Sequence, residues 1–313
     1  DTLTSPVILF FVLGFIAAAL KSDLSIPEAF AKAMSIYLMA AIGLKGGVEV
    51  ANSGVTAEVA AAALAGLALS FLLPVLAFAL LRQFGGLSKV DAGAVAAHYG
   101  SVSAGTFAVV LALAEKSGLP LLPETTLYLV MLELPAIVIM LGLYGALKGQ
   151  GKQAHIWREA LTSRGVLLLG GGVLIGYCYG PVGLEPIAPA LLGGFKTMLA
   201  LFLLEMGLCT AKACVPLPLA QWRLLMFAAL MPFLLAWSGI GTALLLDLPQ
   251  GSAVILAGLT ASASYIAAPA AIRAAIPSAN IGLAMLAALG ITFPVNVLIG
   301  LPVYQHWVSW FYP

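Results

Sequence analysis

The amino-acid sequence predicts an all-α membrane protein that crosses the bilayer many times. Of its 313 residues, 62% are hydrophobic and 9% are charged, whereas a soluble domain carries about 25% charged residues. Ten apolar segments recur along the chain, and most reach the run of about 20 residues that a membrane-spanning helix needs. This composition excludes a soluble globular protein, and a net charge of +1 gives no sign of a nucleic-acid partner.

The ten segments are separated by short breaks rich in Gly, Pro, Asn and charged residues, which are typical of loops. The segments cover residues 5–20, 27–44, 56–81, 91–114, 124–147, 164–180, 187–208, 221–246, 251–275 and 281–304. The sequence therefore divides into a first five-helix unit (1–147), a polar and basic linker (148–163) and a second five-helix unit (164–313). We expect the linker to lie in solvent, with a cytoplasmic partner as the alternative.

Lysine and arginine are distributed unevenly among the loops. Numbered from the N-terminus, the odd loops hold most of them, and the even loops hold only Lys45 and Lys116. Because loops rich in Lys and Arg stay in the cytoplasm, we expect the odd loops there and both termini outside.

The two halves repeat the same features in the same order, at an offset near 160 residues. The matching pairs are Gly43 and Gly207, Pro74 and Pro232, Ser101 and Ser262, Ser103 and Ser264, and Pro135 and Pro294. Five spans per repeat is an odd number, so the second repeat enters the membrane from the opposite face. The sequence thus predicts two inverted-topology repeats, an arrangement of secondary transporters whose sites lie near the midplane at the repeat interface.

Residues 98–106 and 259–267 are the candidate substrate site. Each stretch places a Ser-x-Ser core among small residues in the middle of an apolar segment. Glycine and proline nearby weaken the helix, so we expect the fourth and ninth helices to be broken at the midplane. Freed amides at a half-helix N-terminus bind an anion, and freed carbonyls bind a cation. The predicted substrate-binding residues are Gly100, Ser101, Ser103, Gly105, Thr106, Thr260, Ser262, Ser264 and Tyr265. The alternative is helix packing through small residues.

Glu133 is the main candidate for the coupling ion, because an acid in the middle of a span is costly unless it faces a cavity or a partner. With Ser103, Ser264 and Asn296 it forms the predicted sodium site. A structural ion pair is the alternative for Glu133, and interhelical hydrogen bonding is the alternative for Asn296. We expect His98 to be a packing residue. Lys196 is expected to extend to the membrane surface or to pair with a carboxylate.

The sequence contains no recognisable catalytic constellation. It has no HExxH, GxSxG or Walker motif, and its cysteines, Cys178, Cys209 and Cys214, lack metal-ligand spacing. We therefore expect neither an enzyme nor transport driven by ATP on this chain. The expected cofactor is none, apart from sodium as the coupling ion.

Several of these stretches resemble the sodium-dependent bicarbonate permease family known best from cyanobacteria. The matching pieces are Ile26-Pro27-Glu28-Ala29, Ile42-Gly43-Leu44-x-Gly46-Gly47, Ser101-Val102-Ser103-Ala104-Gly105-Thr106, Leu134-Pro135-Ala136, and Arg273-Ala274-Ala275-Ile276-Pro277-Ser278-Ala279-Asn280. The resemblance implies ten helices in two inverted repeats, a homotrimer, and symport of bicarbonate with sodium. It also implies that a small PII-like protein regulates some members from the cytoplasm.

By position, the resemblance implies that the paired serines and Thr106 face the anion or sodium. It puts Glu133 where the family has an aspartate. The chain departs from the family pattern at Tyr265, where cyanobacterial members carry an aspartate. It also departs at residues 267–270, Ala-Ala-Pro-Ala in place of Ser-Gly-Pro-Pro.

The sequence analysis thus predicts sodium-coupled uptake of bicarbonate by alternating access in the bacterial cytoplasmic membrane. A sodium- or proton-coupled carrier of another small organic anion is the first alternative. A non-transporting membrane scaffold or sensor that binds a partner through residues 148–163 is the second.

Overall fold

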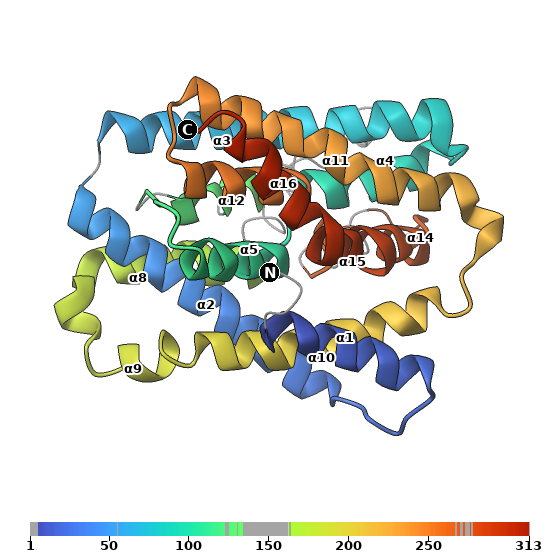
Figure 1. Ribbon diagram of the computed structural model, residues 1–313, viewed down its shortest axis with the longest axis horizontal. Coiled ribbons are helices and arrows are strands. Elements are labelled where there is room, and N and C mark those ends of the chain that lie inside the picture. The colour runs from blue at the N-terminus through green and yellow to red at the C-terminus, as the bar shows by residue number, and fades with distance from the viewer. Residues whose placement is uncertain are drawn as a thin grey trace.

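A computed structural model of the protein (Figure 1) describes residues 6–54, 56–122, 125–129, 131–133, 162, 164–266, 268–269, 272, 276 and 278–312. Over these residues the chain is helical, with turns and short extended connections and no strand. Helices are what a bilayer requires, because every backbone polar group in hydrocarbon must be paired within the segment.

The described elements follow one another along the chain in the order given next. They are α1 (Pro6–Ala19), α2 (Glu28–Ser53), α3 (Ala57–Leu80), η1 (Leu81–Gly85), α4 (Lys89–Gly100), α5 (Ala104–Lys116), α8 (Arg164–Leu184), α9 (Ala188–Leu191), α10 (Phe195–Cys214), η2 (Leu219–Gln221), α11 (Trp222–Leu245), α12 (Gln250–Thr260), α14 (Ile281–Met285), η3 (Leu286–Thr292), α15 (Phe293–Val295), η4 (Asn296–Gly300) and α16 (Leu301–Ser309). Residues 125–129 and 131–133 are also helical. Elements η1, η3 and η4 are π-helical, and η2 is a 3₁₀ turn.

Seven helices of the described part are long and apolar enough to span a membrane, and α1 and α12 are shorter apolar helices. Together they coincide with nine of the ten predicted segments. The fifth segment, 124–147, lies mostly outside the described residues. The chain is therefore a multi-pass helical protein, as predicted.

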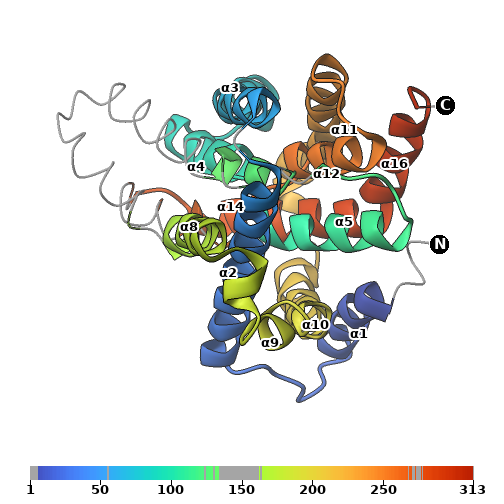
Figure 2. The ribbon, with the colours of Figure 1, turned by 90° about the vertical axis from the view of Figure 1, so that its left-hand side faces the viewer.

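The helices form two groups, which both views separate (Figures 1 and 2). One group contains α1, α2, α8, α9 and α10, and the other contains α3, α4, α11, α12, α14, α15 and α16. Helix α5 lies between the two groups and contacts α2, α10 and α12. This helix therefore connects the two groups through its contacts.

Helices of the first group pair across the two halves of the sequence: α1 packs along α10, and α2 packs along α8. Glycines allow both approaches, because a Cβ at Gly14 would run into the backbone of α10 and a Cβ at Gly43 would run into the backbone of α8. Small residues that let helix backbones approach closely are the usual means of helix association in membranes. The pairing is thus reciprocal between the halves.

The second predicted segment was expected to end at residue 44, with a glycine-rich loop after it. This expectation is wrong, since α2 continues to Ser53. Gly47 does not form a turn there: it lies against α8, where an added Cβ would fall 2.1 Å from the carbonyl oxygen of Val173. The glycine pattern in this stretch therefore serves helix packing.

The centre of the molecule is formed by α4, α5 and α12. Residues 92–111 and 251–265 are buried throughout, whereas α3, α8 and α11 expose large apolar side chains. Both central segments are interrupted. Helix α4 ends at Gly100 and α5 begins at Ala104, while α12 ends at Thr260 and helical backbone reappears at residues 268–269. The expected breaks in the fourth and ninth segments are therefore present.

Candidate functional site

The two interruptions lie against each other and are joined by a pair of hydrogen bonds. The Ser103 backbone N–H donates to the Ser262 Oγ at 2.8 Å, and the Ser264 N–H donates to the His98 carbonyl oxygen at 2.6 Å. Neither bond belongs to a helix, so each break supplies a partner for the other. We call residues 101–103 and 261–265 the crossing.

Three helix ends meet at the crossing, and their dipoles give it a mixed potential. The Ser103 side chain caps α5 by accepting a hydrogen bond from the Thr106 N–H at 3.1 Å. The N-terminus of α5 therefore carries partial positive charge toward the crossing, while the C-termini of α4 and α12 carry partial negative charge. This arrangement suits an anion at one position and a cation at another.

Among the described residues, two buried polar atoms at or beside the crossing have no hydrogen-bond partner, His98 Nε2 and Ser101 Oγ, and the Tyr265 hydroxyl interacts with the Ser103 side chain. The side chains of His98 and Ser101 are fully buried, and Tyr265 is 6% exposed. Burying a polar group without a partner costs about 1–3 kcal/mol. Two such groups, with the Tyr265 hydroxyl beside them, indicate a place where a polar ligand completes the hydrogen bonding.

The orientation of His98 fixes what its free nitrogen can do. Its Nδ1 lies 2.7 Å from the carbonyl oxygen of Ala94, which can only accept, so Nδ1 carries the proton. In the neutral ring Nε2 is then a hydrogen-bond acceptor that has no donor among the described residues. The sequence predicts a packing residue at His98, and its only signal for this acceptor is the position of His98 three residues before Ser101.

Tyr265 packs its ring across the first turn of α5. A Cβ at Gly105 would lie 2.0 Å from the Tyr265 hydroxyl oxygen and 3.1 Å from Phe202 Cε1. The ring also makes an edge-on contact with Phe293, with centroids 5.1 Å apart. Because Gly105 has no side chain, the phenol of Tyr265 can lie at the crossing.

Asn296, a predicted sodium ligand, holds the end of α12. Its Nδ2 donates to the carbonyl oxygen of Ala261 at 2.8 Å, and its Oδ1 accepts from the Tyr304 hydroxyl at 2.7 Å. Thr260 bonds back to carbonyls of its own helix. Asn296 therefore lies at the crossing through Ala261, and its role as a sodium ligand stays a prediction.

Glu133 is buried, at 2% exposure, and its Oε2 has no hydrogen-bond partner in the part of the chain that the structure describes. No hydrogen bond or ion pair described in the structure joins it to the crossing. The structure thus brings together the predicted serines, Gly105, Tyr265 and Asn296, and it leaves the link to Glu133 a prediction.

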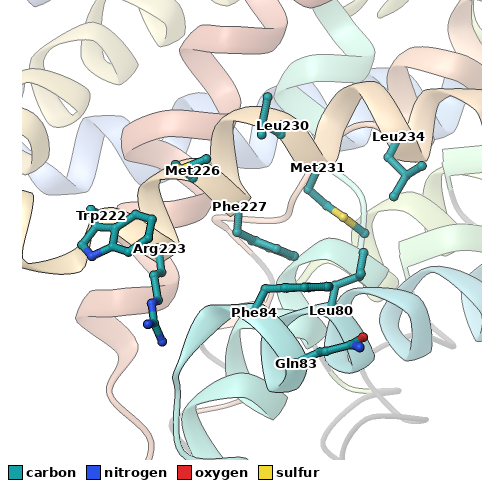
Figure 3. Close-up of a pocket in the computed structure, with 10 residues that line it drawn as sticks. All are labelled: Leu80, Gln83, Phe84, Trp222, Arg223, Met226, Phe227, Leu230, Met231 and Leu234. Carbon is teal, nitrogen blue, oxygen red and sulfur yellow. The ribbon is translucent and has the colours of Figure 1, made fainter.

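A separate groove lies away from the crossing, and none of the predicted site residues lines it. This groove of about 610 Å³ runs between α11 and the end of α3 with η1. Figure 3 shows its walls, which carry Leu80 and Phe84 on one side and Phe227 and Met231 on the other. Several of its side chains are exposed, so the groove faces the apolar surroundings of the helices. Its mainly apolar lining offers few hydrogen-bond donors or positive charges to a small inorganic anion.

The described residues contain no group of three or more His, Cys, Asp or Glu side chains able to hold a metal ion. A comparison with curated proteins gives no significant match. A comparison with protein families gives one that covers nearly the whole chain: the model described as the Na⁺-dependent bicarbonate transporter superfamily matches residues 6–309. That family is a class of transporters and not of enzymes. The chain therefore belongs to the Na⁺-dependent bicarbonate transporter superfamily.

Proposed function

We propose that the chain carries bicarbonate across the membrane together with sodium, and that the anion binds at the crossing. The observation that carries this proposal is the pair of buried polar atoms, His98 Nε2 and Ser101 Oγ, that have no partner among the described residues and lie with the Tyr265 hydroxyl beside the positive end of α5. Bicarbonate has oxygens that accept and one hydroxyl that donates. The Ser101 and Tyr265 hydroxyls can donate to it, and His98 Nε2 can accept from it.

Sodium would neutralise the anion and so reduce the cost of bringing charge to the centre of the membrane. The proposed ligands are Ser103, Ser264, Asn296 and Glu133, with carbonyls from the ends of α4 and α12. Because two ligands that favour each other do so reciprocally, bound sodium raises the affinity for bicarbonate by the same factor as bicarbonate raises that for sodium.

Alternating access would arise from movement of one helix group against the other. The reciprocal pairing of α1 with α10 and of α2 with α8 supports an inverted repeat of ten helices. We also propose that the protein lies in the bacterial cytoplasmic membrane with both termini outside. We propose that it assembles as a homotrimer. The linker, which we expect to lie in solvent with a PII-like partner as the alternative, lies almost wholly outside the described residues.

Replacing Glu133 with Gln tests the sodium assignment, and Glu205→Gln is a matched control. Glu205 is an acid of α10 that accepts a hydrogen bond from Cys209 and has no predicted role in the site. We expect Glu133→Gln to raise the sodium concentration that gives half-maximal bicarbonate uptake by about tenfold, the equivalent of about 1.4 kcal/mol. Glu205→Gln should leave it unchanged. An unaltered sodium dependence in Glu133→Gln would remove Glu133 from the site.

A proton-coupled carrier of a small anion is the second candidate. It is favoured by the burial of two titratable groups, Glu133 and His98, that have a polar atom without a partner in the described structure. Uptake that follows an inward proton gradient and ignores sodium would support this candidate over the first.

A further inference from the structure

A second cavity lies at the opposite end of α5 from the crossing, and its polar lining is charged. It has a volume of about 370 Å³ and is enclosed by α2, α5, the α9–α10 connection and the start of α10. Its charged residues are Lys45 from α2, Glu115 from α5 and Lys196 from α10. The cavity therefore lies between the first helix group and α5.

The three side chains form a chain of ion pairs with an excess of positive charge. Lys45 Nζ bonds to one carboxylate oxygen of Glu115, and Lys196 Nζ lies 3.9 Å from the other. Because 3.9 Å exceeds hydrogen-bond length, no donor of Lys196 is committed to Glu115. The side chains of Lys45 and Glu115 are 35% and 33% exposed, and that of Lys196 is 63% exposed. Two cations and one anion leave a net charge of +1 at the cavity.

We propose that this cavity is a capture site for the entering anion, which binds between Lys45 and Lys196. The ligand class is a small planar oxyanion of the carboxylate type, because the cavity already holds the carboxylate of Glu115 against the same ammonium groups. A bicarbonate-like anion presents the same pair of oxygens and competes with Glu115 for them. This inference rests on the proposed function for the identity of the anion, and it adds a site that is separate from the crossing.

The position of α5 links the two sites. The helix begins at Ala104, beside the crossing, and its twelve steps of about 1.5 Å carry the chain about 18 Å to its end at Lys116. An unneutralised positive charge at a partly enclosed mouth raises the local concentration of anions and their rate of arrival, by about tenfold or more at low ionic strength. Salt weakens the effect, since about 10 Å is the screening length at 0.1 M.

The arrangement also couples capture to the movement of the helix groups. Lys45 and Lys196 belong to the first group, and Glu115 belongs to α5. Sliding of α5 against the first group must break both ion pairs, and an anion that replaces Glu115 between the lysines supplies the same single negative charge during that step.

The test is protection of a cysteine in the cavity, which needs no transport. Leu192, a lining residue, is replaced by Cys in protein whose three native cysteines have been changed to Ala. The rate of its reaction with a negatively charged methanethiosulfonate reagent is measured in detergent, with bicarbonate or with chloride at equal ionic strength. We expect bicarbonate to slow the reaction severalfold more than chloride.

The variants separate binding in the cavity from general surface charge. Lys196→Gln should abolish the protection, and Lys196→Arg, which keeps the charge and guards against misfolding, should retain it. Glu115→Gln removes the competing carboxylate and should lower the bicarbonate concentration needed for half protection. Lys116→Gln is the control, since Lys116 is the next residue on α5 and does not line the cavity.

Equal protection by bicarbonate and chloride, or equal loss of protection in Lys116→Gln and Lys196→Gln, would overturn the capture site. Failure of the capture site and failure of the proposed function give different results. Protection without bicarbonate uptake into liposomes would reject the transport proposal and leave the capture site. Uptake without protection would reject the capture site alone.

Discussion

Gly105→Ala places a methyl group where the phenol of Tyr265 now lies. The added carbon would be 2.0 Å from the hydroxyl oxygen, 3.1 Å from Phe202 Cε1 and 3.3 Å from Tyr265 Cζ. A separation of 2.0 Å is impossible without movement, so Tyr265 must swing away from the first turn of α5. We expect loss of both stability and bicarbonate binding, because the ring packs on Phe293 and its hydroxyl belongs to the proposed anion site.

The structure also indicates how much stability Gly105→Ala should lose and which second substitution should restore it. Overpacking a dense interior by one methyl group typically costs about 1–3 kcal/mol. Tyr265→Phe removes the oxygen at 2.0 Å and leaves ring carbon Cζ at 3.3 Å, a contact that requires a shift of only a few tenths of an ångström. The double variant should therefore recover most of the stability, with a coupling energy of about 1 kcal/mol or more.

Thermal unfolding in detergent, measured for both single variants and the double variant, provides the assay. Gly241→Ala in α11 is the control, because a Cβ there meets nothing within 4 Å, and alanine is the better helix former by up to about 1 kcal/mol. If Gly105→Ala is as harmful with Phe at 265 as with Tyr, the clash with the hydroxyl is not the cause and the reasoning fails.

Three further predictions concern the framework of the site. Ser262→Ala leaves a buried backbone N–H of the other break without its acceptor and should cost about 1–3 kcal/mol in detergent unfolding, whereas a neutral result would contradict the described hydrogen bond. Gly47→Ala forces α2 away from α8 and should lower the melting temperature by several degrees, while Gly170→Ala, which meets nothing within 4 Å, should not. Asn296→Leu removes the hydrogen-bond donor to the carbonyl that ends α12 and should impair bicarbonate uptake more than Tyr304→Phe, which removes a single hydroxyl. Equal effects in uptake assays would count against a role of Asn296 in holding the end of α12.

The sequence was sufficient to predict the helical membrane class and the two breaks, because both follow from strong local signals. Long apolar runs can only be helices in a bilayer, and Ser-x-Ser flanked by glycine or proline marks a weak point in such a run. The helix ends were harder to place. The glycines near residue 47 predict a loop, since a glycine that allows helix packing and one that forms a turn look alike in a single sequence.

The details of the crossing could not be derived from the sequence, because they depend on which atoms meet in space. The free Nε2 of His98 follows from a bond made by its other nitrogen. The fit of Tyr265 against Gly105 joins residues 160 positions apart. The pairing of Lys196 was foreseen only as one of two possibilities, and its partner Glu115 was not named, since only the packing of α5 against α10 brings the two together.

Uptake of radiolabelled bicarbonate into proteoliposomes tests the central claim most directly. The protein is reconstituted and uptake is followed with an inward sodium gradient or with an equal gradient of potassium, with chloride and nitrate as competitors. We predict uptake that requires sodium and resists both competitors. Uptake of the same size in either cation, or none above protein-free liposomes, would contradict sodium-coupled bicarbonate transport by this chain.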